Sequence, residues 1–138
     1  MPYTVFAAPA PKPVTSNESA EIDLDFTTAA TGLSYRIDIV VRGVGGKVLV
    51  SGPVHIGAGA GTDDIRDAIA AALGDGGLEI VPAGGTTLKI ASKGDVRLGS
   101  ITYNTVLANR PAMNLAGPTV RSASGGATMF TNGTRIKP

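Results

Sequence analysis

The chain has 138 residues and a mass of 13.9 kDa, which is enough for one domain of ordinary size. Twelve basic and eleven acidic residues leave a net charge of +1, too weak a field to attract nucleic acid or an anionic membrane. The absence of cysteine excludes disulfides and thiolate chemistry, and a single histidine excludes multi-histidine metal sites. Composition therefore predicts no cofactor, no metal, and neither nucleic acid nor membrane as partner.

Hydrophobic residues make up 43% of the chain, so it is expected to fold around a core. That core should come from Val, Ile, Leu and Ala, because aromatic residues are only 4%. The 19 glycines and 9 prolines indicate many short elements. No apolar run approaches the roughly 20 residues of a membrane span, and early prolines interrupt any signal-peptide pattern.

Residues 1–19 are predicted to form an extended N-terminal arm. Prolines alternate in the sequence PAPKP, and because proline fixes φ and lacks a backbone donor, a polyproline-like conformation is favoured. Such a segment cannot fold alone, so it either docks on a neighbouring subunit or stays in solution. Its expected partner contacts are Tyr3, Val5 and Phe6.

Two strands are predicted near the start of the body. Residues 21–26 alternate apolar and acidic side chains, the period-2 pattern of a half-buried strand whose acidic face meets water. Residues 35–42 alternate in the same way. After a glycine-rich turn a β-branched run follows, so residues 35–51 are predicted to form a hairpin whose return strand extends to residues 54–56.

One helix is predicted over residues 63–73, where Ile, Ala and Leu recur at helical spacing on one face. Thr62 is expected as the N-cap, Asp63 and Asp64 suit the positive end of the macrodipole, and Gly74 is placed to end the helix. Because so short a helix is marginal alone, its apolar stripe is expected to lie on a sheet.

A second hairpin is predicted over residues 78–92, with its turn at residues 82–85, and a further strand over about residues 96–103. The compact, mainly β body is therefore expected to span residues 20–109.

The remaining residues, 110–138, lose periodicity among glycines and prolines and are expected to form a C-terminal arm. Short strands can be placed at about residues 119–122 and 127–130. Isolated apolar side chains in this stretch need partner surface if the arm cannot bury them. The expected partner contacts here are Met113, Leu115, Met129 and Phe130.

The glycine-rich residues 55–62 stand between a predicted strand and a helix start, where phosphate loops occur. No lysine is present there and Asp63 and Asp64 would repel an anion, so a plain connection is expected. Strand alternation places His55 toward solvent or an interface rather than in a catalytic site. Asp63, Asp64 and Asp67 are interpreted as a solvated helix face. Basic residues are scattered along the chain.

Residues 35–101 read as a hairpin, a glycine-rich link, a helix with the pattern TxxIxxAIAAAL, and a second hairpin. This order resembles small β-rich modules of tailed-bacteriophage virion proteins, and the whole chain most resembles a capsid decoration (cement) protein. The resemblance implies a β-sandwich or jelly-roll-like body, dimers or trimers on the outer surface of the capsid, and arms that tie neighbouring capsomers together. It implies the major capsid protein as partner, synthesis in the bacterial cytoplasm, and no catalytic residues.

Two other functions stay open as interpretations of the sequence. A tail, baseplate or head-completion protein uses the same modules and would differ chiefly in copy number. A β-sandwich carbohydrate-binding module would need an exposed aromatic platform, which a chain without tryptophan and with only Tyr3, Tyr35 and Tyr103 supplies poorly. An enzyme is not expected, because no catalytic pairing is recognisable.

Overall fold

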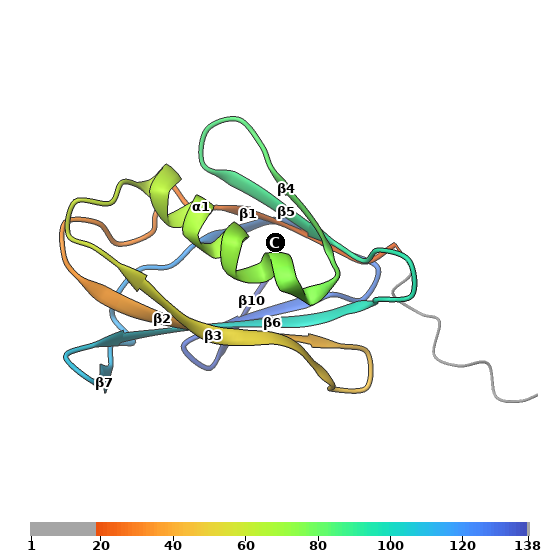
Figure 1. The fold of residues 1–138 in the computed structure, drawn as a ribbon. Coiled ribbons are helices and arrows are strands. Elements are labelled where there is room, and N and C mark those ends of the chain that lie inside the picture. The colour runs from red at the N-terminus through yellow and green to blue at the C-terminus, as the bar shows by residue number, and fades with distance from the viewer. Residues whose placement is uncertain (1–18, 138) are drawn as a thin grey trace, which may run out of the picture.

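The computed structural model describes residues 19–137, which form two stacked β-sheets with one helix at their side (Figure 1). The expected mainly β architecture with a sandwich body and a single short α-helix is confirmed. One sheet has four strands and the other has six.

The four-stranded sheet is antiparallel, with strand order β4-β5-β1-β8. Its strands are β1 (Glu21–Asp25), β4 (Glu79–Pro82), β5 (Thr87–Ala91) and β8 (Thr119–Ser124).

The six-stranded sheet has the order β10-β9-β6-β2-β3, with β7 paired to the end of β6. All its pairs are antiparallel except β6 and β9, which run parallel. Its strands are β2 (Tyr35–Gly43), β3 (Val48–Ile56), β6 (Leu98–Leu107), β7 (Arg110–Pro111), β9 (Thr128–Thr131) and β10 (Thr134–Ile136).

The core lies between the sheets, because alternation turns every second side chain inward. On β2 the inward row is Tyr35, Ile37, Ile39 and Val41, as the sequence predicts. Strands β1, β5 and β6 supply matching rows, and Phe26 and Tyr103 are the largest side chains in the core.

Helix α1 (Thr62–Leu73) closes one side of the sandwich, where it packs against β3 and β4 (Figure 1). Its buried stripe is Ile65, Ile69 and Leu73. The expected cap was wrong by one residue: Gly61 is the N-cap and Thr62 is already helical. At the other end Gly74 keeps a right-handed conformation and starts the 3-10 turn η1 (Gly74–Gly76).

Both predicted hairpins are present. Strand β3 runs through Gly52 and Pro53 to Ile56, and β4 and β5 form the second hairpin. The predicted strand at residues 96–103 begins slightly later and extends to Leu107.

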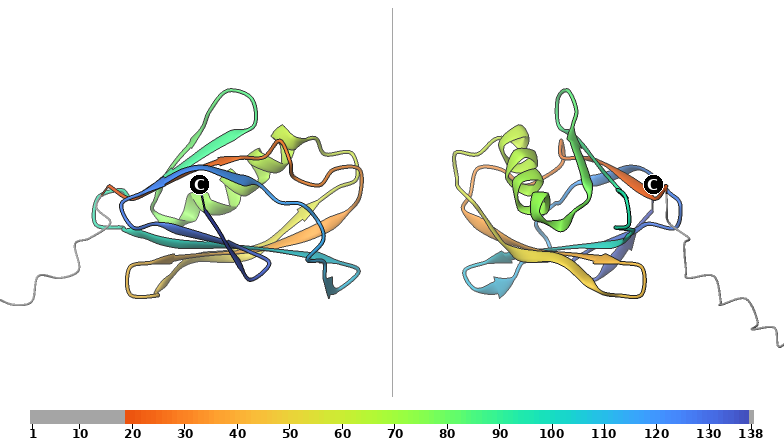
Figure 2. Two further views of the ribbon diagram at one scale, coloured as in Figure 1. Left: turned by 180° about the vertical axis from the view of Figure 1, so that it is seen from behind. Right: turned by 45° about the vertical axis from the view of Figure 1, so that its right-hand side comes forward.

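The C-terminal stretch is part of the body rather than an arm, which corrects the expected boundary at residue 109. Strand β8 pairs with β1, β9 pairs with β6, and β10 lies on the side away from α1 (Figure 2). These strands are short, and a register shift interrupts the pairing of β8 with β1. Too few residues therefore alternate for the apolar pattern to be recognised in the sequence. Residues 1–18, which hold nearly all of the expected N-terminal arm, lie outside the described residues.

Candidate functional site

The expected partner-contact residues differ in how exposed they are in the fold. Met113 is 66% exposed, and Phe130 is half-buried on the outer surface of the six-stranded sheet. Leu115 is half-buried and packs against the core. Met129 is only 1% exposed within the core, so its assignment as a contact residue was wrong. Tyr3, Val5 and Phe6 lie outside the described residues.

The outer surface of the six-stranded sheet, with the adjoining side chain of Met113, is the strongest candidate site and is called here the arginine face. Pairing register brings side chains from distant parts of the chain into cross-strand rows, such as Val40 beside Thr102 and Thr102 beside Phe130. Its members are Arg36, Asp38, Val40, Arg42, Ser51, Pro53, His55, Thr102, Asn104, Val106, Met113, Phe130 and Arg135.

Met113 is exposed on a turn that hydrogen bonds hold firmly to the sheet. The backbone amide of Ala112 donates to the carbonyl of Thr105 at 2.8 Å, and the Thr105 hydroxyl donates back to the carbonyl of Ala112. Asn132 accepts from the amide of Thr105 at 2.9 Å and donates to the carbonyl of Met113 at 3.3 Å. Thr105 itself is 1% exposed. A hydrogen-bond network centred on the buried Thr105 thus fixes the backbone that presents Met113.

A hollow of about 370 Å³ lies beside this methionine. Its walls include Val106, Pro111 and Met113, and Asp38 and Asn132 add polar groups. This combination of apolar walls and a few polar groups is suited to receive one side chain of a partner.

The outer surface of the four-stranded sheet, called here the charged face, pairs both of its cations with acids of the same sheet. Lys89 contacts Glu21 at 3.2 Å, and Arg121 contacts Asp23 at 3.6 Å. The face consists of Glu21, Asp23, Asp25, Glu79, Val81, Thr87, Lys89, Arg121, Ser122 and Ser124.

Asp25 is the most strongly hydrogen-bonded carboxylate of the charged face. It accepts from the hydroxyl of Thr27 at 2.6 Å, the hydroxyl of Thr86 at 2.7 Å and the amide of Thr27 at 2.9 Å. These donors, with the Thr27 hydroxyl first, lower the pKa of Asp25 from 3.8 to about 2. The network joins the end of β1 to the start of β5, so this carboxylate has a structural role.

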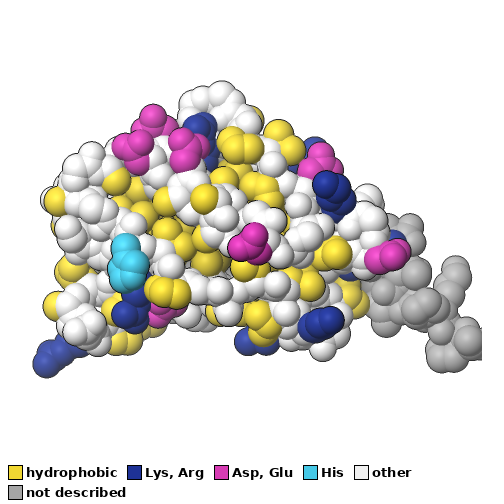
Figure 3. Space-filling view, viewed as in Figure 1, with side chains coloured by type: hydrophobic (Ala, Val, Ile, Leu, Met, Phe, Trp, Pro, Cys, Tyr) yellow, Lys and Arg dark blue, Asp and Glu magenta, His cyan; other side chains and the backbone are white. Residues whose placement is uncertain are grey.

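A third surface, the acidic flank, consists of the exposed side of α1 with η1. Its acids are Asp63, Asp64, Asp67 and Asp75. The view in Figure 3 shows acidic side chains gathered over the first part of α1, while basic side chains lie both along the lower edge and beside acidic ones at the upper right.

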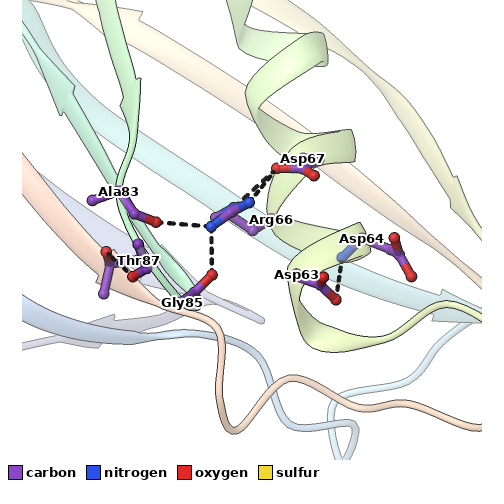
Figure 4. Close-up of polar contacts among 8 residues, drawn as sticks. Asp63, Asp64, Arg66, Asp67, Ala83, Gly85 and Thr87 are labelled. Atoms are coloured by element: carbon purple, nitrogen blue, oxygen red, sulfur yellow. Dashed lines mark hydrogen bonds and ion pairs between the residues drawn. The ribbon is translucent and has the colours of Figure 1, made fainter.

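Arg66 is the one cation of the acidic flank, and Figure 4 shows why it is not available to a ligand. Its guanidinium donates to the carbonyls of Ala83, at 2.8 Å, and Gly85, and contacts Asp67 at 2.7 Å. The side chain is 14% exposed. Arg66 therefore ties α1 to the turn between β4 and β5.

Asp63 and Asp64 act on the backbone at the start of α1. Asp64 accepts from the amide of Gly61 at 2.9 Å, and Asp63 accepts from the amide of Asp64 at 3.0 Å (Figure 4 shows the latter). Among residues 19–137 no group of three or more His, Cys, Asp or Glu side chains is arranged to hold a metal ion.

His55 points outward from β3, as expected, opposite Arg36 on β2. A shallow hollow of about 410 Å³ adjoins it, with Tyr35, Gly57 and Asn109 among its lining residues. No carboxylate or serine hydroxyl of the described residues hydrogen-bonds to His55, so the acid–base arrangement of a hydrolase is not formed there.

The two described tyrosines are core residues. Tyr35 donates its hydroxyl to the carbonyl of Ala30 at 2.8 Å, and burial raises the pKa of Tyr35. Burial, followed by the proximity of Tyr35, raises the pKa of Tyr103 well above its usual range. Neither ring forms the exposed platform on which a sugar stacks.

Comparisons of the chain with protein-family models, curated proteins and solved structures find no match. Within the part of the chain that the structure describes, no helix has the length and apolar character needed to cross a membrane.

Sequence reasoning missed how the charges are sorted. Arg36, Arg42 and Arg135 look scattered along the chain, yet strand order gathers them on one face. The alternation of residues 35–42 predicts which of their side chains face outward, but it does not predict which strands lie beside this one in the sheet.

Proposed function

We propose that this chain is a capsid decoration (cement) protein of a tailed bacteriophage. It binds the major capsid protein on the outside of the shell, assembles as a homo-oligomer and stabilises the shell by bridging capsomers. It is a structural protein without catalytic activity, cofactor or metal. The resemblance of residues 35–101 to virion modules supports this proposal, and so does the sandwich fold.

The observation that carries the proposal is the exposed Met113 on a backbone held by Thr105 and Asn132. Leaving a methionine side chain in water forgoes roughly 1.5–3 kcal/mol of burial, so a fixed and exposed position favours a docking role. Arginine, methionine and phenylalanine are also the residue types enriched in protein interfaces, and the arginine face combines all three.

The carbohydrate-binding alternative receives less support, because Tyr35 and Tyr103 are buried. A tail, baseplate or head-completion role uses the same docking chemistry but requires only a few copies per particle. Copy number therefore separates this role from the decoration role.

Quantitative mass spectrometry of purified phage particles tests the proposal. A ratio to the major shell protein near one-to-one or one-to-two supports a shell-wide cement, and a handful of copies supports the tail role instead. Absence of the chain from the particles would overturn both.

Two variants then locate the contacts. Removing residues 1–19 should lower particle occupancy if the arm bridges capsomers. Met113→Ala should weaken particle binding about fivefold or more, as expected for an interface anchor. Arg121→Ala is the matched control on the charged face and should leave occupancy unchanged. Equal occupancy for Met113→Ala and Arg121→Ala would rule out the arginine face as the docking surface.

A further inference from the structure

The arginine face carries cations that no acid of the described residues neutralises. Its acid, Asp38, is already bound by Arg36 through two hydrogen bonds, at 2.8 Å and 3.2 Å. Arg42 donates only to the neutral carbonyl of Gly46, at 3.1 Å. Arg135 forms no ion pair with a described residue. Because Arg42 and Arg135 are both exposed, their positive charges are open to a partner.

Neutral side chains lie between these two arginines. One cross-strand row consists of Arg135, Phe130, Thr102 and Val40, which come from β10, β9, β6 and β2 in turn. Arg42 lies two residues further along β2, in the next row. A neutral or apolar centre with charged groups at its margin is the usual anatomy of a protein interface.

The spacing of the two arginines suits a surface rather than a small anion. Strands β10 and β2 are separated by β9 and β6. At the usual distance between neighbouring strands, the backbones that carry Arg135 and Arg42 are therefore about 14 Å apart. Each guanidinium is suited to bind one carboxylate through two parallel hydrogen bonds. A partner that carries several carboxylates can satisfy both arginines at once.

The rest of the charge distribution favours an acidic protein over nucleic acid. Proteins that bind a phosphate backbone line it with many basic side chains, whereas the row between these arginines is neutral and the whole chain has a net charge of +1. The acidic flank repels an acidic partner, and the arginine face attracts it. This difference orients the chain so that the arginine face meets the partner.

We propose that the arginine face binds an acidic surface of the major capsid protein, whose carboxylates pair with Arg42 and Arg135. The inference rests on the proposed function, which supplies the capsid as the occupant of this face, and it adds the chemistry of the docking surface on the capsid. Charge complementarity with the two unpaired guanidinium groups is what selects carboxylates.

Titration of the full chain onto phage particles prepared without it tests the proposal, at about 0.05 M and about 0.5 M NaCl. The affinity should fall about tenfold or more at the higher salt concentration, because added ions screen the ion pairs across the interface. Equal affinity at both concentrations would overturn the proposal and leave the proposed function standing. Absence of binding at both would overturn the two together. Equally tight and equally salt-dependent binding to double-stranded DNA would identify a phosphate backbone as the ligand instead.

Paired substitutions locate the charges. Arg42→Gln with Arg135→Gln should weaken particle binding about tenfold at low salt and reduce its salt dependence, because the ion pairs are lost. Arg42→Lys with Arg135→Lys keeps both charges and should keep most of the salt dependence. Lys89→Gln with Arg121→Gln removes the same charge from the charged face and should bind like the parent chain. An equal loss in this control would overturn the proposal, because net charge would then set the affinity. Circular dichroism verifies that each variant is folded.

Carbodiimide coupling identifies the carboxylates of the partner directly. The reagent activates a carboxylate, and a neighbouring lysine amine then attacks the activated carbonyl carbon, forms an amide bond and releases the reagent as a urea. The variant with Arg42→Lys and Arg135→Lys, bound to particles, should become linked to Asp or Glu side chains of the major capsid protein, which peptide mass spectrometry detects. Lys89 on the charged face should gain no such link. Links from Lys89 but none from positions 42 and 135 would contradict the proposal.

Discussion

The arginine face and the charged face are built by the same rule of strand alternation but differ in what they leave unsatisfied. Their strands turn Ile, Leu and Val side chains toward the core. On the outside, the charged face pairs Glu21 with Lys89 and Asp23 with Arg121. The arginine face leaves cations without acidic partners beside an exposed Met113. Because the fold accounts for the inward side chains and for the paired outward ones, the unpaired cations and the exposed methionine of the arginine face point to a partner.

The largest expected effect comes from truncating a side chain that strand alternation turns toward the core. Ile39→Ala removes a side chain that is 1% exposed on β2 and should lower the free energy of unfolding by about 2–4 kcal/mol. Val40→Ala, the next residue, faces outward and should cost less than about 1 kcal/mol. Chemical denaturation measures both. Similar losses for the two variants would contradict the assigned faces.

The next largest effect is expected in the hydrogen-bond network that supports Met113 on the arginine face, which the charged face lacks. Asn132→Ala removes the acceptor for the Thr105 amide and strains a backbone φ of 50°, so about 2 kcal/mol of stability should be lost. Hydrogen exchange of the Ala112 amide should accelerate as well. Asn132→Asp keeps the acceptor and should be milder. An unchanged hydrogen-exchange rate of the Ala112 amide would show that this network does not hold the Met113 turn.

A smaller effect probes the charged face through pH. The pKa of Asp25 is about 2 in the fold, below its ordinary 3.8, because Thr27 and Thr86 donate hydrogen bonds to it. The unfolded chain therefore takes up this proton first as pH falls. The stabilisation is complete above about pH 5 and is lost as pH falls toward 2. Asp25→Asn should flatten the pH dependence of the free energy of unfolding in that window, and an unaltered slope would be evidence against the network.

The smallest expected effect is the loss of an exposed ion pair on the charged face. Lys89→Ala removes the partner of Glu21, and both side chains are well exposed. The free energy of unfolding should fall by less than about 0.5 kcal/mol, and particle occupancy should not change. A clear loss of occupancy would mean that the charged face also docks and would remove the distinction between the faces.

Local patterns in the sequence predicted the first half of the fold well. The alternation of residues 35–42 and the stripe and acidic start of α1 act over a few neighbouring residues, so β2, β3 and the helix could be placed. The strands from β7 onward are two to six residues long and depend on distant partners, such as β6 for the parallel strand β9. No local pattern identifies such pairings.

The candidate site was predictable only in part, for the same reason. Met113 and Phe130 were noticed as apolar residues in a polar stretch, but the same reasoning selected Met129, which the pairing of β9 with β6 buries. The network that fixes Met113 joins Thr105 to Asn132, 27 residues apart. The arginine face likewise exists only once five strands lie side by side.

Hydroxyl-radical footprinting of the two described methionines tests most directly whether the arginine face is the docking surface. In the free chain Met113 should oxidise readily, and Met129 should resist because it is buried. On phage particles, oxidation of Met113 should fall several-fold while Met129 stays unreactive. Oxidation of Met113 at the same rate in the free chain and on particles would contradict the account.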